Sequence, residues 1–194
     1  MDKKGHRGLR KNWQQAPLAR LLARLAKGGV IVELGCGKGV LLNHLYKGTQ
    51  EGAKLPVYGI DPYQPYVGAA AGGIYGPKTR EALLRNLKAF GMEGRVSIIQ
   101  ERAEDVAPSW TRPVALLWVD TGQPYDELAP ILEAWQKHIV WHGLIGISAL
   151  WYDKRVHVSR LPDFLRPFGF RRRLCQQRHV VVLWREAGSD STKD

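Results

Sequence analysis

The chain has 194 residues, of which 44% are hydrophobic and 24% are charged. This length supports one hydrophobic core, and apolar blocks of strand and helix length exclude a disordered chain. No apolar stretch reaches the ~20 residues of a membrane-spanning helix, and no apolar signal segment follows the basic N-terminus. Two cysteines, Cys36 and Cys175, are too few for a disulfide framework and indicate a reducing cytoplasm.

The net charge of +11 is concentrated at the two ends of the sequence. Residues 1–27 hold eight basic residues and one acidic residue, and residues 154–194 hold ten basic and four acidic residues. The intervening residues 28–153 hold 11 basic and 13 acidic residues and are nearly neutral. Basic ends can bind a polyanion or an acidic ligand, and they can equally serve solubility alone.

The hydrophobic pattern predicts helices that alternate with short strands. The first helix covers residues 13–26 and is ended by Gly28-Gly29. Its apolar face is expected to consist of Leu18, Leu21, Leu22 and Leu25. Further helices are predicted over 40–46, 77–90, 125–139 and 161–168. Strands are predicted over 30–34, 57–60, 95–100, 114–119 and 143–148, followed by a hairpin of strands 170–177 and 179–185.

Short apolar strands that alternate with helices are typical of a parallel sheet covered on both faces. The predicted fold class is therefore α/β, a Rossmann-like, doubly wound, mostly parallel seven-stranded sheet with a C-terminal antiparallel hairpin. We expect residues 1–27 to form a basic helix packed on one domain over residues 28–186, followed by a polar tail at 187–194. Ligands of such folds bind at the carboxyl ends of the strands.

The segment Val30–Gly39 reads as a strand that enters a glycine-rich turn and then a helix. Its glycines permit positive φ angles and close approach of a ligand, and the helix start offers unpaired N–H groups. The dinucleotide pattern G-x-G-x-x-G does not fit, because Val40 stands where the third glycine is required. Glu33, two residues before the first glycine, suits a cationic ligand better than a pyrophosphate.

Glu33, Gly35, Gly37 and Gly39 complete the motif E/D-x-G-x-G-x-G, and in this the sequence resembles the class I S-adenosylmethionine-dependent methyltransferases. The resemblance implies that the loop packs against the methionine part of the cofactor S-adenosyl-L-methionine, with Cys36 as a small residue in contact with it. Glu33 is then expected near the ammonium and sulfonium charges of the cofactor.

A second cofactor element is expected after the strand 57–60. Asp61, followed by Pro62, stands at the strand end, 26 residues after Gly35. An acid at this place is expected to accept hydrogen bonds from both ribose hydroxyls, as the corresponding carboxylate does in dinucleotide-binding folds.

The bend after the third predicted strand borders the adenine in the family that the sequence resembles. Arg102 and Ala103 occupy the corresponding positions, and Glu104 is expected to accept from the adenine amino group. A solvated acidic turn is the alternative interpretation of the same residues.

Residues 120–125 read D-T-G-Q-P-Y and resemble small-molecule O-methyltransferases related to catechol O-methyltransferase, in which this strand ends in I-D-G-D-H-x-Y. The second acid and the histidine are replaced by Gly122 and Gln123. Ser148 follows the fifth strand, where metal-using relatives place a ligand. Since Mg²⁺ requires several converging oxygen ligands, no metal is predicted.

Asp120 is the first candidate for the general base or for the group that holds the acceptor, and it also borders the cofactor. Tyr125, Tyr152 and His157 are further candidates for the same role. Residues 63–76 contain three tyrosines and four glycines and are a candidate lid, with a plain insertion as the alternative.

The sequence thus predicts a cytoplasmic S-adenosyl-L-methionine-dependent methyltransferase that O-methylates a small molecule. Neither a metal ion nor association with a membrane is expected. One alternative is a nucleic-acid (RNA) methyltransferase that uses the basic termini, among them Arg171–Arg173, although no N/D-P-P-Y/F motif follows the fourth strand. The other is a catalytically inactive cofactor-binding module, which the changes at Gly122 and Gln123 favour. The oligomeric state is left open, with a dimer among the options.

Overall fold

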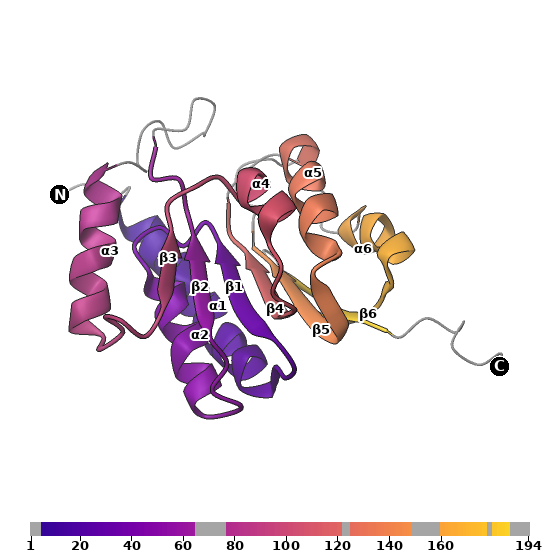
Figure 1. Cartoon of the computed structure of the whole chain (residues 1–194), viewed down its shortest axis with the longest axis horizontal. Helices are drawn as coiled ribbons and strands as arrows, with labels where there is room; N and C mark the ends of the chain where they lie inside the picture. The colour runs from indigo at the N-terminus through magenta and orange to yellow at the C-terminus, as the bar shows by residue number, and fades with distance from the viewer. Residues whose placement is uncertain (1–4, 65–76, 122–124, 149–159, 178–179, 187–194) are drawn as a thin grey trace.

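The computed structural model describes residues 5–64, 77–121, 125–148, 160–177 and 180–186 (Figure 1). In chain order the elements are α1 (Gly5–Leu25), β1 (Val30–Leu34), α2 (Val40–Gln50), β2 (Val57–Ile60), α3 (Pro77–Ala89), β3 (Ser97–Ile99), α4 (Ala103–Val106), the 3₁₀ turn η1 (Ala107–Ser109), β4 (Val114–Val119), α5 (Tyr125–Gln136), β5 (Ile139–Ile147), α6 (Arg160–Leu165), the 3₁₀ turn η2 (Arg166–Phe168), β6 (Phe170–Gln177) and β7 (Val180–Arg185).

The described strands form one sheet in the order β3-β2-β1-β4-β5-β7-β6, with seven strands. Strands β1 to β5 pair in parallel, and β7 pairs antiparallel with both β5 and β6. Every residue of β1 and β4 is buried, as expected for central strands of a sheet covered on both faces. The expectation of a mostly parallel α/β sheet ending in an antiparallel hairpin is confirmed.

Strand β5 begins four residues earlier than the sequence predicts, directly after α5. The pairing of β4 with β5 shifts between Val114, which lies opposite Ile139, and Leu116, which lies opposite Leu144. His142 has a φ of 62° within this irregular stretch. A bulge of this kind interrupts the apolar alternation, and the pattern therefore reveals only the regular part of the strand.

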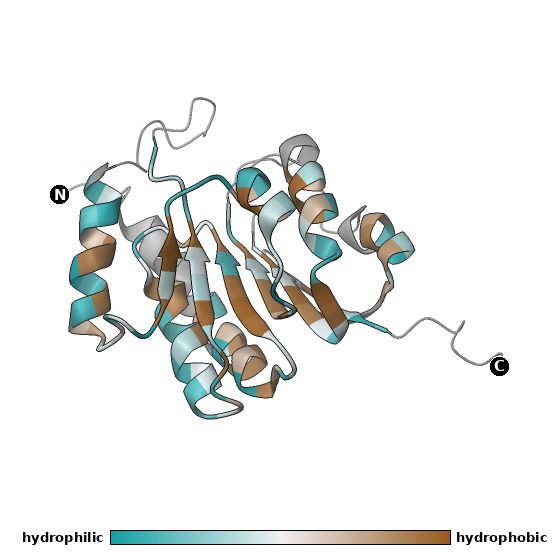
Figure 2. Ribbon diagram, viewed as in Figure 1, coloured by the Kyte–Doolittle hydropathy of each residue, from teal (hydrophilic) through white to brown (hydrophobic). Residues whose placement is uncertain are grey.

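The helices form two layers on opposite faces of the sheet (Figure 1). Buried side chains of α1, α2 and α3, such as Leu22, Leu42 and Leu83, belong to one core cluster, and those of α5 and α6 belong to the other. Neighbouring residues of β4 divide between them, because successive strand side chains point to opposite faces. The central strands are accordingly the most hydrophobic part of the fold in Figure 2. None of the helices among the described residues is long and apolar enough to cross a membrane.

The predicted apolar face of α1 is wrong in part. Leu22 is buried, but the side chains of Leu21 and Leu25 are 41% and 57% exposed. At Gly48 of α2 a Cβ atom would lie 2.2 Å from the carbonyl oxygen of Arg20, so the two helix backbones are in close contact. Such an approach requires small residues in place of leucine. The buried alanines of α1 and the turn after it are Ala16, Ala19, Ala23 and Ala26.

Substitution of Gly48 by alanine tests this contact. Alanine is the better helix former by about 1 kcal/mol, but its methyl group would overlap the Arg20 carbonyl. We expect Gly48→Ala to lower the free energy of unfolding in urea by about 1–3 kcal/mol. The exposed Lys47→Ala is the control, with a change within about 0.5 kcal/mol. A Gly48→Ala variant as stable as the parent would contradict the close packing of α1 on α2.

Candidate functional site

The residues that follow β2, β1, β4 and β5 lie in a row at one edge of the sheet. In each case the backbone N–H donates to the carbonyl of the last residue of the neighbouring strand. The donor-to-acceptor distances are 3.1, 2.8, 2.9 and 2.8 Å for Asp61, Gly35, Asp120 and Ser148, respectively. From β1 the chain adds β2 and β3 on one side of the sheet and then β4 and β5 on the other side. Gly35 and Asp120 therefore flank the switch point, at which α/β sheets bind ligands.

The glycine loop between β1 and α2 has the backbone conformation that its sequence predicts. Gly35, Gly37 and Gly39 have φ angles of 81°, 48° and 75°, in the left-handed region that favours glycine. A Cβ atom at Gly35 would lie 2.6 Å from the Asp120 carbonyl oxygen, and one at Gly39 would lie 2.5 Å from a methyl carbon of Leu83. Space and backbone conformation therefore both require glycine at Gly35, whereas at Gly39 the requirement comes chiefly from the positive φ angle.

Three carboxyl groups lie next to this loop. Glu33 is 1% exposed within β1, Asp61 is 6% exposed, and Asp120 is half-buried. Burial raises the pKa of Asp61, against two backbone hydrogen bonds that lower it. Burial, together with the nearby charges of Glu33 and Asp61, also raises the pKa of the Cys36 thiol. The loop therefore lies in a negative potential, which suits a cationic ligand and opposes a pyrophosphate.

Both backbone polar groups of Gly37 are held by the segment after β2. The Asp61 carboxylate accepts the N–H of Gly37 at 2.9 Å through one oxygen and the N–H of Tyr63 at 2.9 Å through the other. The Tyr63 hydroxyl donates to the carbonyl oxygen of Gly37 at 3.1 Å and lies 3.1 Å from the sulfur of Cys36. Burial raises the pKa of Tyr63, so the hydroxyl remains a donor at neutral pH.

Tyr63 was predicted to belong to a lid, but the structure places its side chain in the interior. Its side chain is 2% exposed, and its φ of 51° is unusual for a residue other than glycine. Such a conformation persists only where the surroundings enforce it. The adjacent D-P-Y sequence is the available signal, but the glycines and tyrosines that follow within residues 66–76 favoured a loop. Residues 65–76 of the candidate lid lie outside the described residues.

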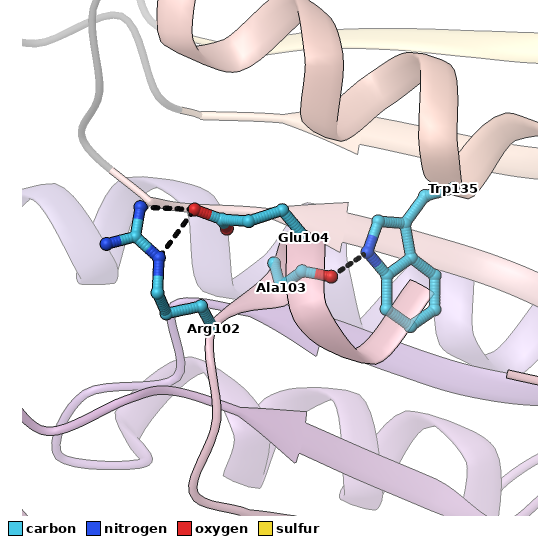
Figure 3. Close-up of polar contacts among 4 residues, drawn as sticks. All are labelled: Arg102, Ala103, Glu104 and Trp135. Carbon is cyan, nitrogen blue, oxygen red and sulfur yellow. Dashed lines mark hydrogen bonds and ion pairs between the residues drawn. The ribbon is translucent and has the colours of Figure 1, made fainter. Parts of the chain in front are cut away.

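The bend after β3 places Arg102 and Glu104 against each other (Figure 3). Two guanidinium nitrogens of Arg102 donate to the same Glu104 oxygen, one of them at 2.7 Å. Ala103, 7% exposed, opens α4, and its carbonyl accepts the indole N–H of Trp135 at 2.9 Å. Glu104 thus has a partner within the chain that the sequence did not predict, and the bend is fixed to α5.

The ends of β4 and β5 are joined by a serine hydroxyl. Ser148 is fully buried, and its hydroxyl donates to the carbonyl of Val119 at 3.2 Å. Asp120 and Thr121 follow β4, and the buried Thr121 hydroxyl oxygen has no hydrogen-bond partner among the described residues. An unmet buried polar atom costs about 1–3 kcal/mol and marks a place for a ligand or water. Sequence reasoning did not single out Thr121.

The remaining predicted site residues lie partly within and partly outside the described residues. Tyr125 begins α5, and Pro62 is half-buried beside Asp61. Gly122, Gln123, Tyr152 and His157 lie outside the described residues. Within the described part of the chain, no three His, Cys, Asp or Glu side chains form a group able to hold a metal ion.

Residues 32–147 match a family model described as a methyltransferase domain. No curated protein sequence matches the chain. Among solved structures, an O-methyltransferase family protein from Burkholderia thailandensis has 13% identity and a TM-score of 0.63, over 91% of this chain and 57% of that one. This chain therefore spans little more than half the length of that protein.

Two further structures are similar over most of both chains. A methyltransferase from Geobacter sulfurreducens has 20% identity and a TM-score of 0.64, over 90% of this chain and 79% of that one. An SAH-bound methyltransferase from Podospora anserina has 20% identity and a TM-score of 0.61, over 89% and 78%. At these identities the likeness establishes the fold. The family match covers more than half of the chain and confirms the resemblance based on the glycine motif, so the chain belongs to the methyltransferase-domain family.

Proposed function

We propose that the chain is an S-adenosyl-L-methionine-dependent methyltransferase that methylates an oxygen of a small-molecule acceptor without a metal. The observation that carries this proposal is the clustering of three carboxyl groups around a left-handed glycine loop at the switch point of the sheet. A sulfonium nucleoside brings positive charge to such a place, and the carboxyl groups of Glu33, Asp61 and Asp120 complement it. Membership of the methyltransferase family supports the reaction class.

In this proposal the residues Gly35, Cys36, Gly37 and Gly39 contact the methionine part of the cofactor, and Glu33 neutralises its ammonium and sulfonium charges. Because the left-handed glycines carry no side chains, a ligand can approach the backbone closely at this point. Tyr63 and Asp61 keep the loop in this form before the cofactor arrives, because they hold both polar groups of Gly37.

Asp61, with Pro62 beside it, is proposed to accept the ribose hydroxyls. Each of its carboxylate oxygens accepts one backbone N–H and retains a second acceptor site. Arg102 and Ala103 are proposed to border the adenine. The hydrogen bond from Trp135 to Ala103, and the pairing of Arg102 with Glu104, support a bend of fixed shape.

When bound, the cofactor supplies an already activated methyl group, so the protein has little covalent chemistry to perform. The chain aligns the acceptor hydroxyl and excludes water. Asp120 is proposed to hold that hydroxyl and to take its proton on a carboxylate oxygen as the acceptor oxygen gains the methyl group. Thr121, with its unmet hydroxyl, adds a polar contact beside Asp120.

The donor set beyond Asp120 supports chemistry without a metal. The hydroxyl of Ser148 is used as a donor to the Val119 carbonyl, which ties it to the sheet. Gly122 replaces an acid of the metal-using pattern and provides no side-chain ligand. Mg²⁺ prefers several oxygen ligands in near-octahedral geometry, and one carboxylate meets this requirement poorly.

Calorimetric titration with S-adenosylhomocysteine tests the cofactor site. We expect binding by the parent chain and an affinity about 10–100-fold lower for Asp61→Asn, because an amide nitrogen cannot accept a backbone N–H. Asp105→Asn, an exposed acid on α4, is the control and should bind as the parent does. If neither S-adenosylmethionine nor S-adenosylhomocysteine bound the parent with a Kd below the order of 100 μM, the proposal would be withdrawn.

The variant Tyr63→Phe tests whether the hydroxyl presets the glycine loop. Loss of its hydrogen bond to Gly37 should lower the free energy of unfolding by about 0.5–1.5 kcal/mol and weaken S-adenosylhomocysteine binding severalfold. Tyr46→Phe is the matched control, because its hydroxyl only accepts a long 3.4 Å bond from the exposed Arg95. Unchanged affinity in a destabilised Tyr63→Phe would show that the tyrosine serves the core alone.

Metal independence is testable once an acceptor is found by screening hydroxylated small molecules for S-adenosylhomocysteine release. EDTA and added Mg²⁺ should leave the rate unchanged. Asp120→Asn should lower kcat by about 10²–10⁴-fold and, because Asp120 also borders the cofactor, weaken S-adenosylhomocysteine binding by no more than severalfold. Activity lost in EDTA and restored by Mg²⁺ would contradict the proposal.

A further inference from the structure

The near-neutral middle of the sequence consists of two segments of opposite net charge. Residues 28–95 contain eight basic and five acidic residues, whereas residues 96–153 contain three basic and eight acidic residues. The first segment supplies α2 and α3, and the second supplies α4 and α5, on opposite faces of the sheet (Figure 1). The near-neutral middle of the sequence is therefore a basic layer and an acidic layer in the folded molecule.

The basic layer consists of α1, α2 and α3 with their connecting turns, and we call its exposed surface the basic face. Its described exposed acids are Glu51, Glu81 and Glu93. Among the described residues of this layer, Arg20 forms an ion pair with Glu51 that lowers the pKa of this carboxyl group, and the positive charge of Arg24 lowers it further. The exposed basic residues are Arg20, Arg24, Lys27, Lys38, Lys47, Lys54, Lys78, Arg80, Arg85, Lys88 and Arg95.

The positive charges of the basic face affect the pKa of a histidine that lies among them. A groove between α1 and α2 is lined by Arg20, Arg24 and His44, with Glu51 as its acidic member. Burial, followed by the positive charges of Lys47 and Arg20, lowers the pKa of His44. Like charges gathered on one surface repel each other and do not stabilise a fold. Their accumulation on one face favours an external polyanion as the counter-charge.

We propose that the basic face docks a polynucleotide through its phosphates. On α3 alone, the basic residues from Lys78 to Lys88 are separated by ten residue steps of helix, about 15 Å, or roughly four steps of 3.4 Å along one nucleic-acid strand. Basic residues on three helices make a track for a polymer, whereas a single phosphate ester needs only one cluster. The opposite layer carries the exposed acids Glu101, Asp105 and Glu133 among its basic residues and is therefore the less favourable face for a polyanion.

The basic face also reaches the candidate site. Lys38 is exposed between Gly37 and Gly39 of the glycine loop, and the side-chain amide of Asn86 on α3 donates to its carbonyl at 2.9 Å. A strand bound along α3 therefore passes beside the switch point. The inference goes beyond the proposed function and does not rest on it. The docking surface is the outer surface of the helices α1, α2 and α3, whereas the proposed cofactor site lies at the carboxyl edge of the sheet.

Fluorescence anisotropy of a labelled single-stranded RNA of about 20 nucleotides, with the full chain, tests the proposal. We expect binding at about 50 mM salt, with a log–log salt slope of about −0.7 for each phosphate contacted. The variant Arg85→Glu/Lys88→Glu on α3 should bind at least about tenfold more weakly. Arg112→Glu/Lys137→Glu on the opposite layer makes the same change in net charge and should bind as the parent does.

The two double variants distinguish the effect of where the charges lie from the effect of the total charge of the protein. Equal weakening by the two double variants, or no binding by the parent at low salt, would overturn the proposal. DNA of the same sequence is a second arm, in which equal affinity indicates phosphate contacts alone and weaker affinity identifies RNA as the partner. Binding to vesicles that contain phosphatidylserine, with none to either polynucleotide, would also overturn it.

A calorimetric titration of each double variant with S-adenosylhomocysteine accompanies this experiment. Affinity equal to that of the parent shows that the variants are folded and that the cofactor site is intact. A chain that binds S-adenosylhomocysteine but no polynucleotide refutes the docking face alone, and the reverse result refutes the proposed function alone.

Discussion

The parallel pairing of β1 between β2 and β4 is the constraint on which the site depends. Backbone hydrogen bonds continue one residue beyond the strand ends and fix Gly35 between Asp61 and Asp120. The first glycine of the loop then lies so close to the Asp120 backbone that no side chain fits. A shift of one residue in this pairing would move the carboxyl groups to the wrong face. The positions of the chemical groups thus follow from strand register.

Buried carboxyl groups are unfavourable in a protein interior unless they are hydrogen-bonded or paired. Asp61 meets this requirement through two backbone N–H groups, one from the glycine loop and one from the chain that follows it. Its pKa is nevertheless raised, because burial outweighs these bonds. A cation placed beside it would relieve this penalty. The clustered carboxyl groups therefore support the proposal of a positively charged ligand at this edge.

The fold divides its tasks between an edge and a face. The carboxyl edge gathers acidic groups and glycine backbone, and the layer of α1, α2 and α3 gathers exposed lysines and arginines. These opposite potentials lie close together at Lys38, which belongs to the glycine loop yet points its charge to solvent. Water screens exposed charges over about 10 Å at ordinary salt, so each region can keep its own preference.

The sequence by itself determined three of the strands and the glycine loop. β1, β2 and β4 were predicted with their observed bounds, because a strand buried on both faces is mostly apolar and a turn signal such as Gly or Asp-Pro marks the end of β1 and β2. The tertiary structure alone decided which face of α1 is buried, since the approach of α2 favours alanine where hydrophobicity favoured Leu21 and Leu25. It also decided the inward position of Tyr63 and placed the two segments of opposite charge on opposite faces of the sheet. These depend on contacts between residues distant in the chain, and local composition carries no record of which neighbours the sheet brings together.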